Sequence, residues 1–220
     1  MPHNRFFHSD LNPAEITITG DEHSHLFKVM RAHEGSVLEL IDGKGTLAHG
    51  TVLAIDKKSA QIALSKKQHH NPPPETTLAQ SFIKQPKLEL VIEKCTELGI
   101  TDFHLFPAEK SERDHLSDNN LQRLHNIIIA ATKQCGRLYL PTLHIHSKVP
   151  ILKDAAYATL KGNPPHLLNT HVKRLYIGPE AGWSAHEEKQ LQATPVTLHP
   201  LTLRAETAAI VACSYLTACL

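Results

Sequence analysis

The sequence lacks the features that mark exported, membrane-spanning or disulfide-stapled proteins. Its first residues contain no long apolar core and no small-residue cleavage site, so no secretory signal is expected. Its longest apolar segment, residues 208–220, is shorter than the roughly 20 residues that a bilayer-spanning helix needs, and it predicts a buried helix. The four cysteines are far apart and form no C-x-x-C pair, which predicts reduced thiols. We therefore expect a cytoplasmic protein with no membrane segment.

The sequence also lacks a strong charge of either sign. Its 23 Lys and Arg residues nearly balance 22 Asp and Glu residues, for a formal net charge of +1. Proteins that bind nucleic acid without sequence preference usually carry a clear positive excess. Any contact with nucleic acid is therefore expected to depend on a local basic face.

Histidine is abundant, with 17 residues, but metal-ligand spacing is missing. The close pairs are His23/His25, His69/His70 and His144/His146. Zinc sites on helices place histidines three or four residues apart and add a carboxylate or a cysteine, and these pairs do not follow that pattern. We expect no metal site.

The first third of the chain reads as short strands joined by tight turns. Strands are predicted over residues 36–41, 50–55 and 60–64, with turn signals such as Asp42-Gly43 between them. One helix is predicted to begin at Gly20 or Asp21, and its apolar face consists of Leu26, Val29 and Met30. These elements predict a small β-barrel with one helix.

A domain boundary is predicted over residues 66–74. Three consecutive prolines at 72–74 lack backbone donors and fix an extended backbone, so this segment is not expected to continue a strand. The predicted domains are residues 1–70 and residues 75–220.

Beyond this boundary, strands alternate with helices. Strands are predicted over 77–83, 101–106, 142–145 and 174–177, and helices over 86–98 (ended by Gly99), around 121–131 and from about Ile151. The stripe of the helix around 121–131 consists of Leu121, Leu124, Ile127, Ile128 and Ala131. This alternation predicts an α/β domain with a parallel sheet covered on both faces.

Two segments of the second domain concentrate groups that can hold a ligand. Gly178-Pro179-Glu180-Ala181-Gly182-Trp183 follows a strand directly, and Ser184 is the expected N-cap of the next helix. It matches neither G-x-G-x-x-G nor a P-loop. Residues 198–209 follow another strand and open the last helix, where Arg204, Glu206 and Thr207 gather. Local spacing alone favours a simple turn and a capped helix start over a ligand site.

Taken together, separate motifs along nearly the whole chain resemble the bacterial 16S ribosomal RNA uracil-N3 methyltransferases of the SPOUT superfamily, the RsmE family. In the first domain they are Arg5-Phe6-Phe7, His25-Leu26, Val29-Met30-Arg31, Gly35 and Asp42-Gly43. In the second they are Lys94-x-x-Glu97-Leu98-Gly99, Ser111-Glu112-Arg113, Ala131-x-x-Gln134-x-x-Arg137, Ile177-Gly178-Pro179-Glu180 and Leu203-Arg204-Ala205-Glu206-Thr207-Ala208.

The resemblance implies a PUA-like barrel that binds RNA, followed by a SPOUT domain whose C-terminal part forms a deep trefoil knot. It implies S-adenosylmethionine as cofactor, 16S ribosomal RNA or the small ribosomal subunit as partner, and a homodimer with its active sites at the dimer interface. The implied cofactor-binding residues are Leu168, Asn169, Gly178, Pro179, Glu180, Gly182, Leu198, Pro200, Leu203, Glu206, Thr207 and Ala208.

The chain departs from the family pattern at two places. Ala181-Gly182 stands where the family usually has two glycines, and His199 and Leu201 stand where it usually has glycine and arginine. Histidine adopts positive φ less readily than glycine, and leucine lacks a guanidinium. These departures leave open a cofactor-free RNA-binding or assembly factor, and a SPOUT enzyme for another RNA base is the other alternative.

Roles follow from the chemistry of methyl transfer to a uracil nitrogen. Arg204 is the candidate donor that stabilises the anion formed when N3 loses its proton, and Glu180 and Glu206 are alternative hydrogen-bond acceptors. For phosphate contacts the candidates are Arg5, Lys28 and Arg31 on the barrel and Lys84, Arg113 and Arg137 near the cleft. For each of them a solvated surface charge is an equally good reading. Phe6 and Phe7 are expected in the core rather than stacked on bases.

Overall fold

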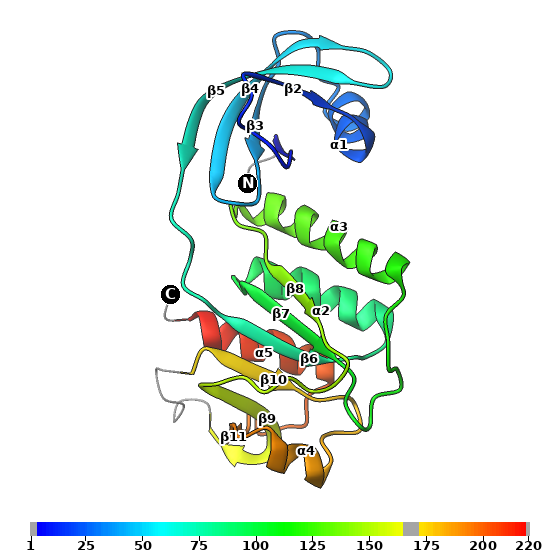
Figure 1. Cartoon of the computed structure of the whole chain (residues 1–220), viewed down its shortest axis with the longest axis vertical. Coiled ribbons are helices and arrows are strands. Elements are labelled where there is room, and N and C mark those ends of the chain that lie inside the picture. Colours follow the sequence, from blue (N-terminus) through cyan, green and yellow to red (C-terminus); the bar gives the residue numbers. More distant parts are fainter. Residues whose placement is uncertain (1–3, 165–171, 219–220) are drawn as a thin grey trace. The chain divides into compact units, whose positions relative to one another are not determined.

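The structure is a computed structural model that describes residues 4–164 and 172–218. The chain divides into two compact units (Figure 1). The first contains Met1–Pro73 and Ile129–Leu140, and the second contains Pro74–Ile128 and Pro141–Leu220. Across the described residues, no helix combines the length and apolar character needed to cross a bilayer.

The first unit is built on a mainly antiparallel sheet. Its elements are β1 (Arg5–Phe7), β2 (Glu15–Ile18), α1 (Gly20–Ser24), β3 (Val37–Ile41), β4 (Thr46–Ile55) and β5 (Ala60–His69). The strands are ordered β1-β3-β4-β5-β2, and only the β1–β3 pair is parallel. The predicted strands and the helix start at Gly20 are confirmed.

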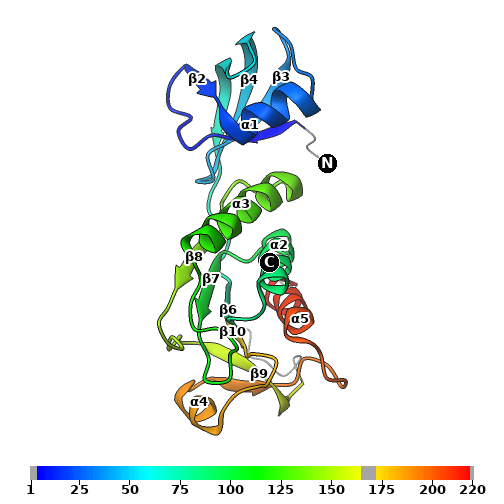
Figure 2. The ribbon, with the colours of Figure 1, turned by 90° about the vertical axis from the view of Figure 1, so that its right-hand side faces the viewer.

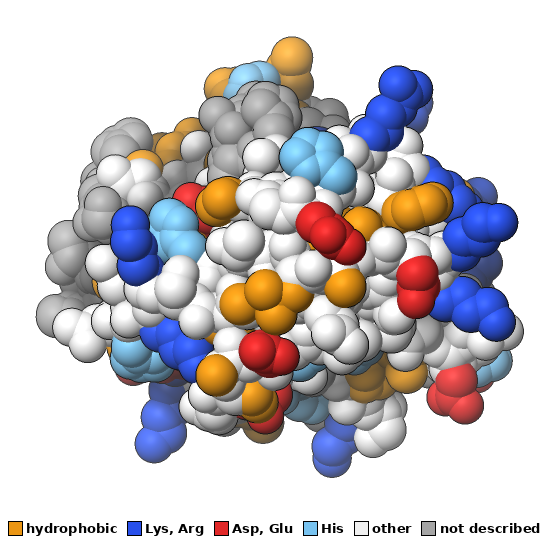
Figure 3. Space-filling view, turned by 90° about the horizontal axis from the view of Figure 1, so that it is seen from above, with side chains coloured by type: hydrophobic (Ala, Val, Ile, Leu, Met, Phe, Trp, Pro, Cys, Tyr) orange, Lys and Arg blue, Asp and Glu red, His pale blue; other side chains and the backbone are white. Residues whose placement is uncertain are grey.

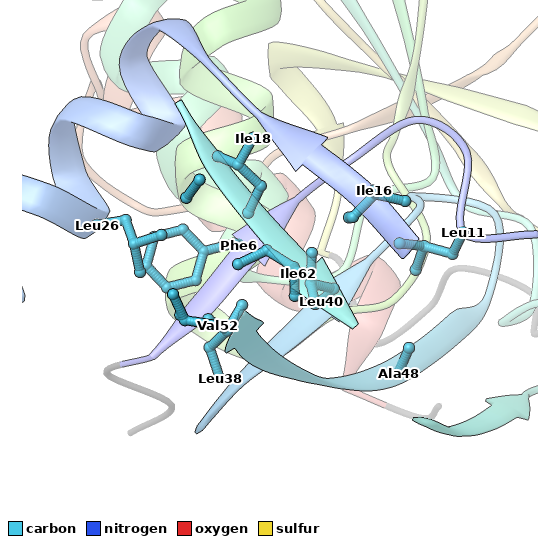
Figure 4. Close-up of a cluster of buried hydrophobic side chains, with 11 residues drawn as sticks. Phe6, Leu11, Ile16, Ile18, Leu26, Leu38, Leu40, Ala48, Val52 and Ile62 are labelled. Carbon is cyan, nitrogen blue, oxygen red and sulfur yellow. The ribbon is translucent and has the colours of Figure 1, made fainter. Parts of the chain in front are cut away.

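The core of this unit forms because alternate residues of each strand point to one side. Figure 4 shows Phe6 surrounded by side chains from the neighbouring strands and from the helical segment, including Leu26, Leu40 and Ile62. Phe6 is fully buried, so it belongs to the core as expected and is not available to stack on a base.

The helical segment differs from the prediction at one position. After α1 the chain continues as a π-helix over His25–Val29, in which the amide of Met30 donates to the carbonyl of His25 at 3.0 Å. This wider turn breaks the 3.6-residue spacing that placed Val29 on the apolar face. Leu26 is buried as predicted, whereas Val29 is 68% exposed.

The end of β5 is also different from the prediction. The strand runs through His69, because Gln68 and His69 pair with Leu47 and Thr46 of β4. The expectation that residues 66–74 interrupt the strand was therefore wrong for 66–69. Only the prolines at 72–74 lack the backbone N–H groups that pair with a neighbouring strand, and the strand ends before them.

The second unit contains a parallel sheet with helices. Its elements are β6 (Thr77–Ser81), α2 (Gln85–Glu97), β7 (Asp102–Phe106), the first part of α3 (Asp118–Cys135), β8 (Thr142–Ile145), β9 (Ala155–Asn163), β10 (Arg174–Ile177), α4 (Ala185–Gln190), β11 (Thr194–Val196) and α5 (Ala205–Thr217). The part of α3 from Ile129 onward belongs to the first unit. Within the described residues the strand order is β11-β9-β10-β6-β7-β8, and all neighbouring pairs are parallel. The predicted parallel α/β sheet is confirmed. The trefoil knot stays a prediction.

The last helix lies against the first helix of this unit. Figure 2 shows α5 beside α2 on one side of the sheet, and α5 also contacts β10 and β6. Leu88, Val91 and Ile92 of α2 are fully buried. As a result, the start of α5 is held close to the carboxyl end of β10.

One predicted helix is a strand. The segment after Ile151 forms β9, which pairs in parallel with β10 on one side and β11 on the other. Alanine favours helices, which made the helix prediction reasonable from local sequence. Burial of Ala156 and Tyr157 between two strands outweighs that local preference.

Candidate active site

A cavity of about 450 Å³ lies in the second unit, where β9, β10 and β11 lead into loops. Its walls come from residues 158–161, 177–183, 197–199 and 201–203, with Glu188, Ala205 and Ala208. Open parallel sheets bind their ligands outside the carboxyl ends of the strands. The two segments that the sequence analysis singled out therefore share one cavity of a size suited to a small organic molecule.

The turn after β10 forms one wall and depends on close packing. A Cβ atom added at Gly178 would lie 2.9 Å from the indole ring of Trp183. The Trp183 Nε1 group donates a hydrogen bond to the carbonyl of Ala158 in β9 at 3.0 Å. The ring also stacks near Phe106, with 6.2 Å between ring centroids. Trp183 thus fixes the turn against the sheet, and glycine at 178 allows the approach.

A buried carboxylate anchors the far end of the same turn. Glu187 is 2% exposed and accepts hydrogen bonds from the backbone amides of Ser184 (2.9 Å) and Glu109 (2.8 Å). The Ser184 hydroxyl accepts one from the Glu187 amide at 3.0 Å, which completes a capping box and confirms Ser184 as the N-cap. The Ser-x-x-Glu spacing carries this signal in the sequence.

A lysine that no sequence motif predicted links both segments of the site. Lys87, in the first turn of α2, lies 3.1 Å from Glu180 Oε1 and 3.5 Å from Glu206 Oε2. The hydrogen bond to Glu180 is the main cause of the raised pKa of Lys87. Glu180 follows β10 and Glu206 lies at the start of α5. This single cation therefore contacts both predicted ligand-binding segments.

Most of the predicted cofactor-binding residues line the cavity. These are Gly178, Pro179, Glu180, Gly182, Leu198, Leu203 and Ala208. Pro200, Glu206 and Thr207 are not among the lining residues, and Leu168 and Asn169 lie outside the described residues.

The family departures His199 and Leu201 both line the cavity. The Nδ1 atom of His199 accepts a hydrogen bond from the amide of Leu201 at 3.1 Å, so its ring caps its own loop. The volume of about 450 Å³ remains with this ring in place. His199 therefore does not fill the cavity.

Arg204 occupies the helix boundary, outside the lining of the cavity. It is the N-cap of α5, with an extended backbone (φ −67°, ψ 155°), and it is exposed. Because the helix begins directly after it, the cavity-lining Leu203 and Ala205 flank Arg204. Arg204 is therefore an exposed residue between two residues of the cavity wall.

The candidate RNA-binding residues of the first unit differ in their exposure and in their contacts with other side chains. Arg5 binds the Glu39 carboxylate through two nitrogens at 3.0 and 2.7 Å, and its side chain is 9% exposed. Lys28 and Arg31 are exposed. Arg137 is half-buried, and burial lowers its pKa. The space-filling view in Figure 3 shows Lys and Arg side chains at several places around the rim of the visible face.

In the second unit, Lys84 and Arg113 are exposed. The ammonium of Lys84 lies 3.7 Å from a carboxylate oxygen of Glu112. Such an exposed pair contributes little stability.

Three histidines pack together: His104 of β7, His144 of β8 and His146, which follows β8. His104 Nδ1 lies 2.9 Å from His146 Nε2, and the rings of His104 and His144 are 4.4 Å apart. Burial and the two neighbouring imidazoles lower the pKa of His104 to about 4. Within residues 4–164 and 172–218, no group of three or more His, Cys, Asp or Glu side chains is arranged to hold a metal ion.

A small sheet domain followed by a parallel α/β domain with a cavity at its strand ends defines a two-domain protein with a site suited to a small molecule. A model of the RNA methyltransferase domain matches residues 70–217, and a model of the RNA methyltransferase PUA domain matches residues 18–65. The chain therefore belongs to the RNA methyltransferase family.

Individual relatives agree with this assignment. Ribosomal RNA small subunit methyltransferase E of Synechocystis is 29% identical over 94% of this chain and 74% of its own, and that of Helicobacter pylori is 25% identical over 89% and 91%. A Legionella pneumophila structure with bound SAM is 25% identical and covers 98% of this chain and 97% of its own, with a TM-score of 0.85. The Neisseria gonorrhoeae methyltransferase E structure, bound to S-adenosyl methionine, shares the fold at 22% identity, 98% and 97% coverage and a TM-score of 0.86.

Proposed function

We propose that this protein uses S-adenosylmethionine to methylate N3 of a specific uridine in 16S ribosomal RNA. The observation that carries the proposal is the shared cavity, because its walls come from both segments of the family motif. The relatives named ribosomal RNA small subunit methyltransferase E support the choice of substrate. Action on ribosomal RNA also fits a cytoplasmic location.

The residues of the cavity fit S-adenosylmethionine in size and chemistry. About 450 Å³ lies within the usual range of roughly 300–1,000 Å³ for small-molecule sites. Leu198, Leu203 and Ala208 offer apolar surface to an adenine ring, while Glu180 and Glu188 offer negative charge to a cationic ligand. Glycines 178 and 182 allow backbone amides to approach it closely. Bound there, the cofactor supplies a methyl group activated by a positively charged sulfur.

Residues of the protein then position the uracil and assist the removal of its N3 proton. N3 of uracil becomes a nucleophile only when its proton leaves, and the negative charge spreads to O2 and O4. The exposed guanidinium of Arg204, next to the cavity, is the proposed donor to one of these oxygens. Glu180 and Glu206 remain alternative acceptors, although their shared contact with Lys87 favours a bracing role.

RNA docking is proposed to use the exposed cations of both units. Lys28 and Arg31 in the first unit and Lys84 and Arg113 in the second are positioned at the surface, and Arg137 is half-buried. Arg5 is proposed to contribute less, because Glu39 already binds its guanidinium.

The protein is proposed to act as a homodimer through α5. This helix carries apolar residues around its circumference, a pattern typical of helices that are buried on all sides. In this single chain, however, Tyr215 is 47% exposed, and Ile210 and Val211 are only partly covered. A second copy that packs on this face would bury them. Tyr215→Glu is expected to convert a species of twice the chain mass into a monomer in equilibrium sedimentation.

Methyl transfer to 16S ribosomal RNA tests the proposal directly. RNA from cells that lack the gene should lose one N3-methyluridine, and the wild-type gene should restore it. Arg204→Ala should bind cofactor and RNA but transfer the methyl group about a hundredfold more slowly, the usual effect of removing one oxyanion donor. Full turnover by this variant would refute the role of Arg204.

Two other functions make different predictions in the same experiments. An enzyme for another RNA base would leave this methylation intact and remove a different one. A cofactor-free assembly factor, the alternative raised by His199 and Leu201, would give no heat with S-adenosylmethionine.

A further inference from the structure

Lys87 stands between the two segments that build the cavity, although it does not line the cavity itself. Its ammonium contacts Glu180 on the turn after β10 and Glu206 on the first turn of α5. These segments are separated in sequence, and each contributes walls to the cavity. We propose that Lys87 is a positioning residue that fixes the two segments at the spacing the cofactor requires. This inference rests on the proposed function, which makes the cavity a cofactor site.

Charge explains why the cation is needed. Both carboxylate oxygens lie within 3.5 Å of the same nitrogen, so without it two negative groups face each other at short range. Glu206 is 12% exposed on its side chain, and its Oε2 atom is buried and accepts no hydrogen bond among the described residues. Water therefore cannot readily replace the ammonium at this oxygen. Repulsion would push the turn and the helix start apart.

The helix that carries Lys87 is a suitable anchor. Leu88, the next residue, is fully buried, as are Val91 and Ile92 one turn later. The same helix packs on α5. The stem of Lys87 thus starts from a fixed backbone, and the ammonium is fixed relative to both segments.

The single tryptophan of the chain reports on this arrangement without any ligand. Trp183 is the only tryptophan, it lines the cavity, and it is 9% exposed. If Lys87 holds the turn, Lys87→Met should shift Trp183 emission to longer wavelength and increase acrylamide quenching about twofold. It should also weaken binding of S-adenosylhomocysteine, measured by calorimetry, by about tenfold, because the two wall segments would no longer be fixed at the spacing that the ligand requires. Lys87→Arg should retain most of both properties.

Lys94→Met is the matched control. Lys94 lies on the same helix and also contacts two carboxylates, Glu93 and Glu97, both at 2.8 Å. It does not line the cavity and contacts neither wall segment among the described residues. Lys94→Met should leave Trp183 emission and ligand affinity unchanged, which separates the proposed role from a general effect of losing a lysine of α2.

A double-mutant cycle with Glu206→Gln tests the mechanism. With one carboxylate neutralised, Lys87→Met should cost clearly less affinity than it costs in the wild-type protein. Additive losses, or unchanged Trp183 quenching in Lys87→Met, would overturn the inference. If the wild-type protein gives no heat with S-adenosylhomocysteine, the proposed function fails instead, and the quenching of Trp183 in the Lys87 variants still decides this inference. Thermal unfolding of each variant confirms that it is folded.

Discussion

The two units of this chain differ in where their candidate functional residues lie. In the first, strands that follow one another in sequence pair as neighbours, β3 with β4 and β4 with β5, and their side chains fill a core. Its exposed candidate functional groups are surface cations such as Lys28 and Arg31. In the second, β10 lies between β9 and β6, so residues far apart in sequence meet around a cavity. A surface can be inferred from residue type, whereas a cavity depends on which distant segments meet.

Glycine substitutions give the largest expected difference between the units. A Cβ atom at Gly162 of β9 would lie 2.4 Å from the backbone nitrogen of Val196, which cannot move without breaking the β9–β11 pairing. A Cβ atom at Gly50 of β4 would meet side-chain methyl groups of Ile62 and Leu40, both at 2.6 Å, and of Leu38 at 3.4 Å. We expect Gly162→Ala to lower the free energy of unfolding by about 3 kcal/mol and Gly50→Ala by about 1 kcal/mol. Urea denaturation measures both, and equal costs would contradict this account.

Arg5 tests whether a basic residue of the first unit serves stability or RNA. Arg5→Ala removes two charged hydrogen bonds from Glu39 and should lower the free energy of unfolding by about 2 kcal/mol. It should leave the salt dependence of RNA binding almost unchanged. Lys28→Ala, which changes an exposed cation, is the control for stability and should unfold like the wild type. A stable Arg5→Ala protein with a reduced salt dependence would reverse the assignment.

The histidine cluster predicts a pH dependence of stability in the second unit. The pKa of His104 is lowered from 6.5 to about 4, so between these values the unfolded chain binds a proton that the folded chain does not. Stability is therefore fully present above pH 6.5 and falls as the pH drops towards 4. His104→Gln should flatten the stability profile in this range, measured by urea denaturation at each pH. An unchanged slope would show that His104 does not titrate as described.

The smallest expected effect is that of a single surface cation on RNA binding. If Lys28 contacts one phosphate, Lys28→Ala should reduce the slope of log affinity against log salt by about 1 and weaken binding equally for related sequences. Arg31→Ala should behave alike, and Lys94→Met is the control on the second unit. Filter binding at several salt concentrations measures the slope. An unchanged slope for both variants would exclude this face of the first unit from RNA docking.

Local signals predicted much of the fold. The Gly99 stop, the Ser184 cap and the strand over 174–177 all depend on residues close in sequence, and all are confirmed. The helix predicted from Ile151 failed because pairing with β10 and β11, not local preference, decides the conformation of β9. Residues 129–140 join the first unit through contacts such as the Tyr139 hydroxyl with the His70 carbonyl at 2.8 Å. No local pattern encodes that contact.

The site was predictable to a similar degree. The segments at 178–182 and 198–208 are visible in the sequence as a glycine turn and a charged helix start, but their residues were predicted to bind a cofactor only from the resemblance to the RsmE family. Lys87 could not be predicted, because its importance arises only when Glu180 and Glu206 come together around it. Trp183 was visible as part of the turn, but its hydrogen bond to Ala158 depends on the unexpected strand β9.

Calorimetric titration of the protein with S-adenosylhomocysteine tests the central claim, that the cavity between residues 177–183 and 197–208 binds the methyl donor. The wild-type protein should bind one ligand per chain. Gly178→Val, whose added side chain would meet the Trp183 ring, should bind at least about a hundredfold more weakly while it remains folded. Absence of heat with the wild-type protein, or equal affinity in the folded Gly178→Val variant, would contradict the account.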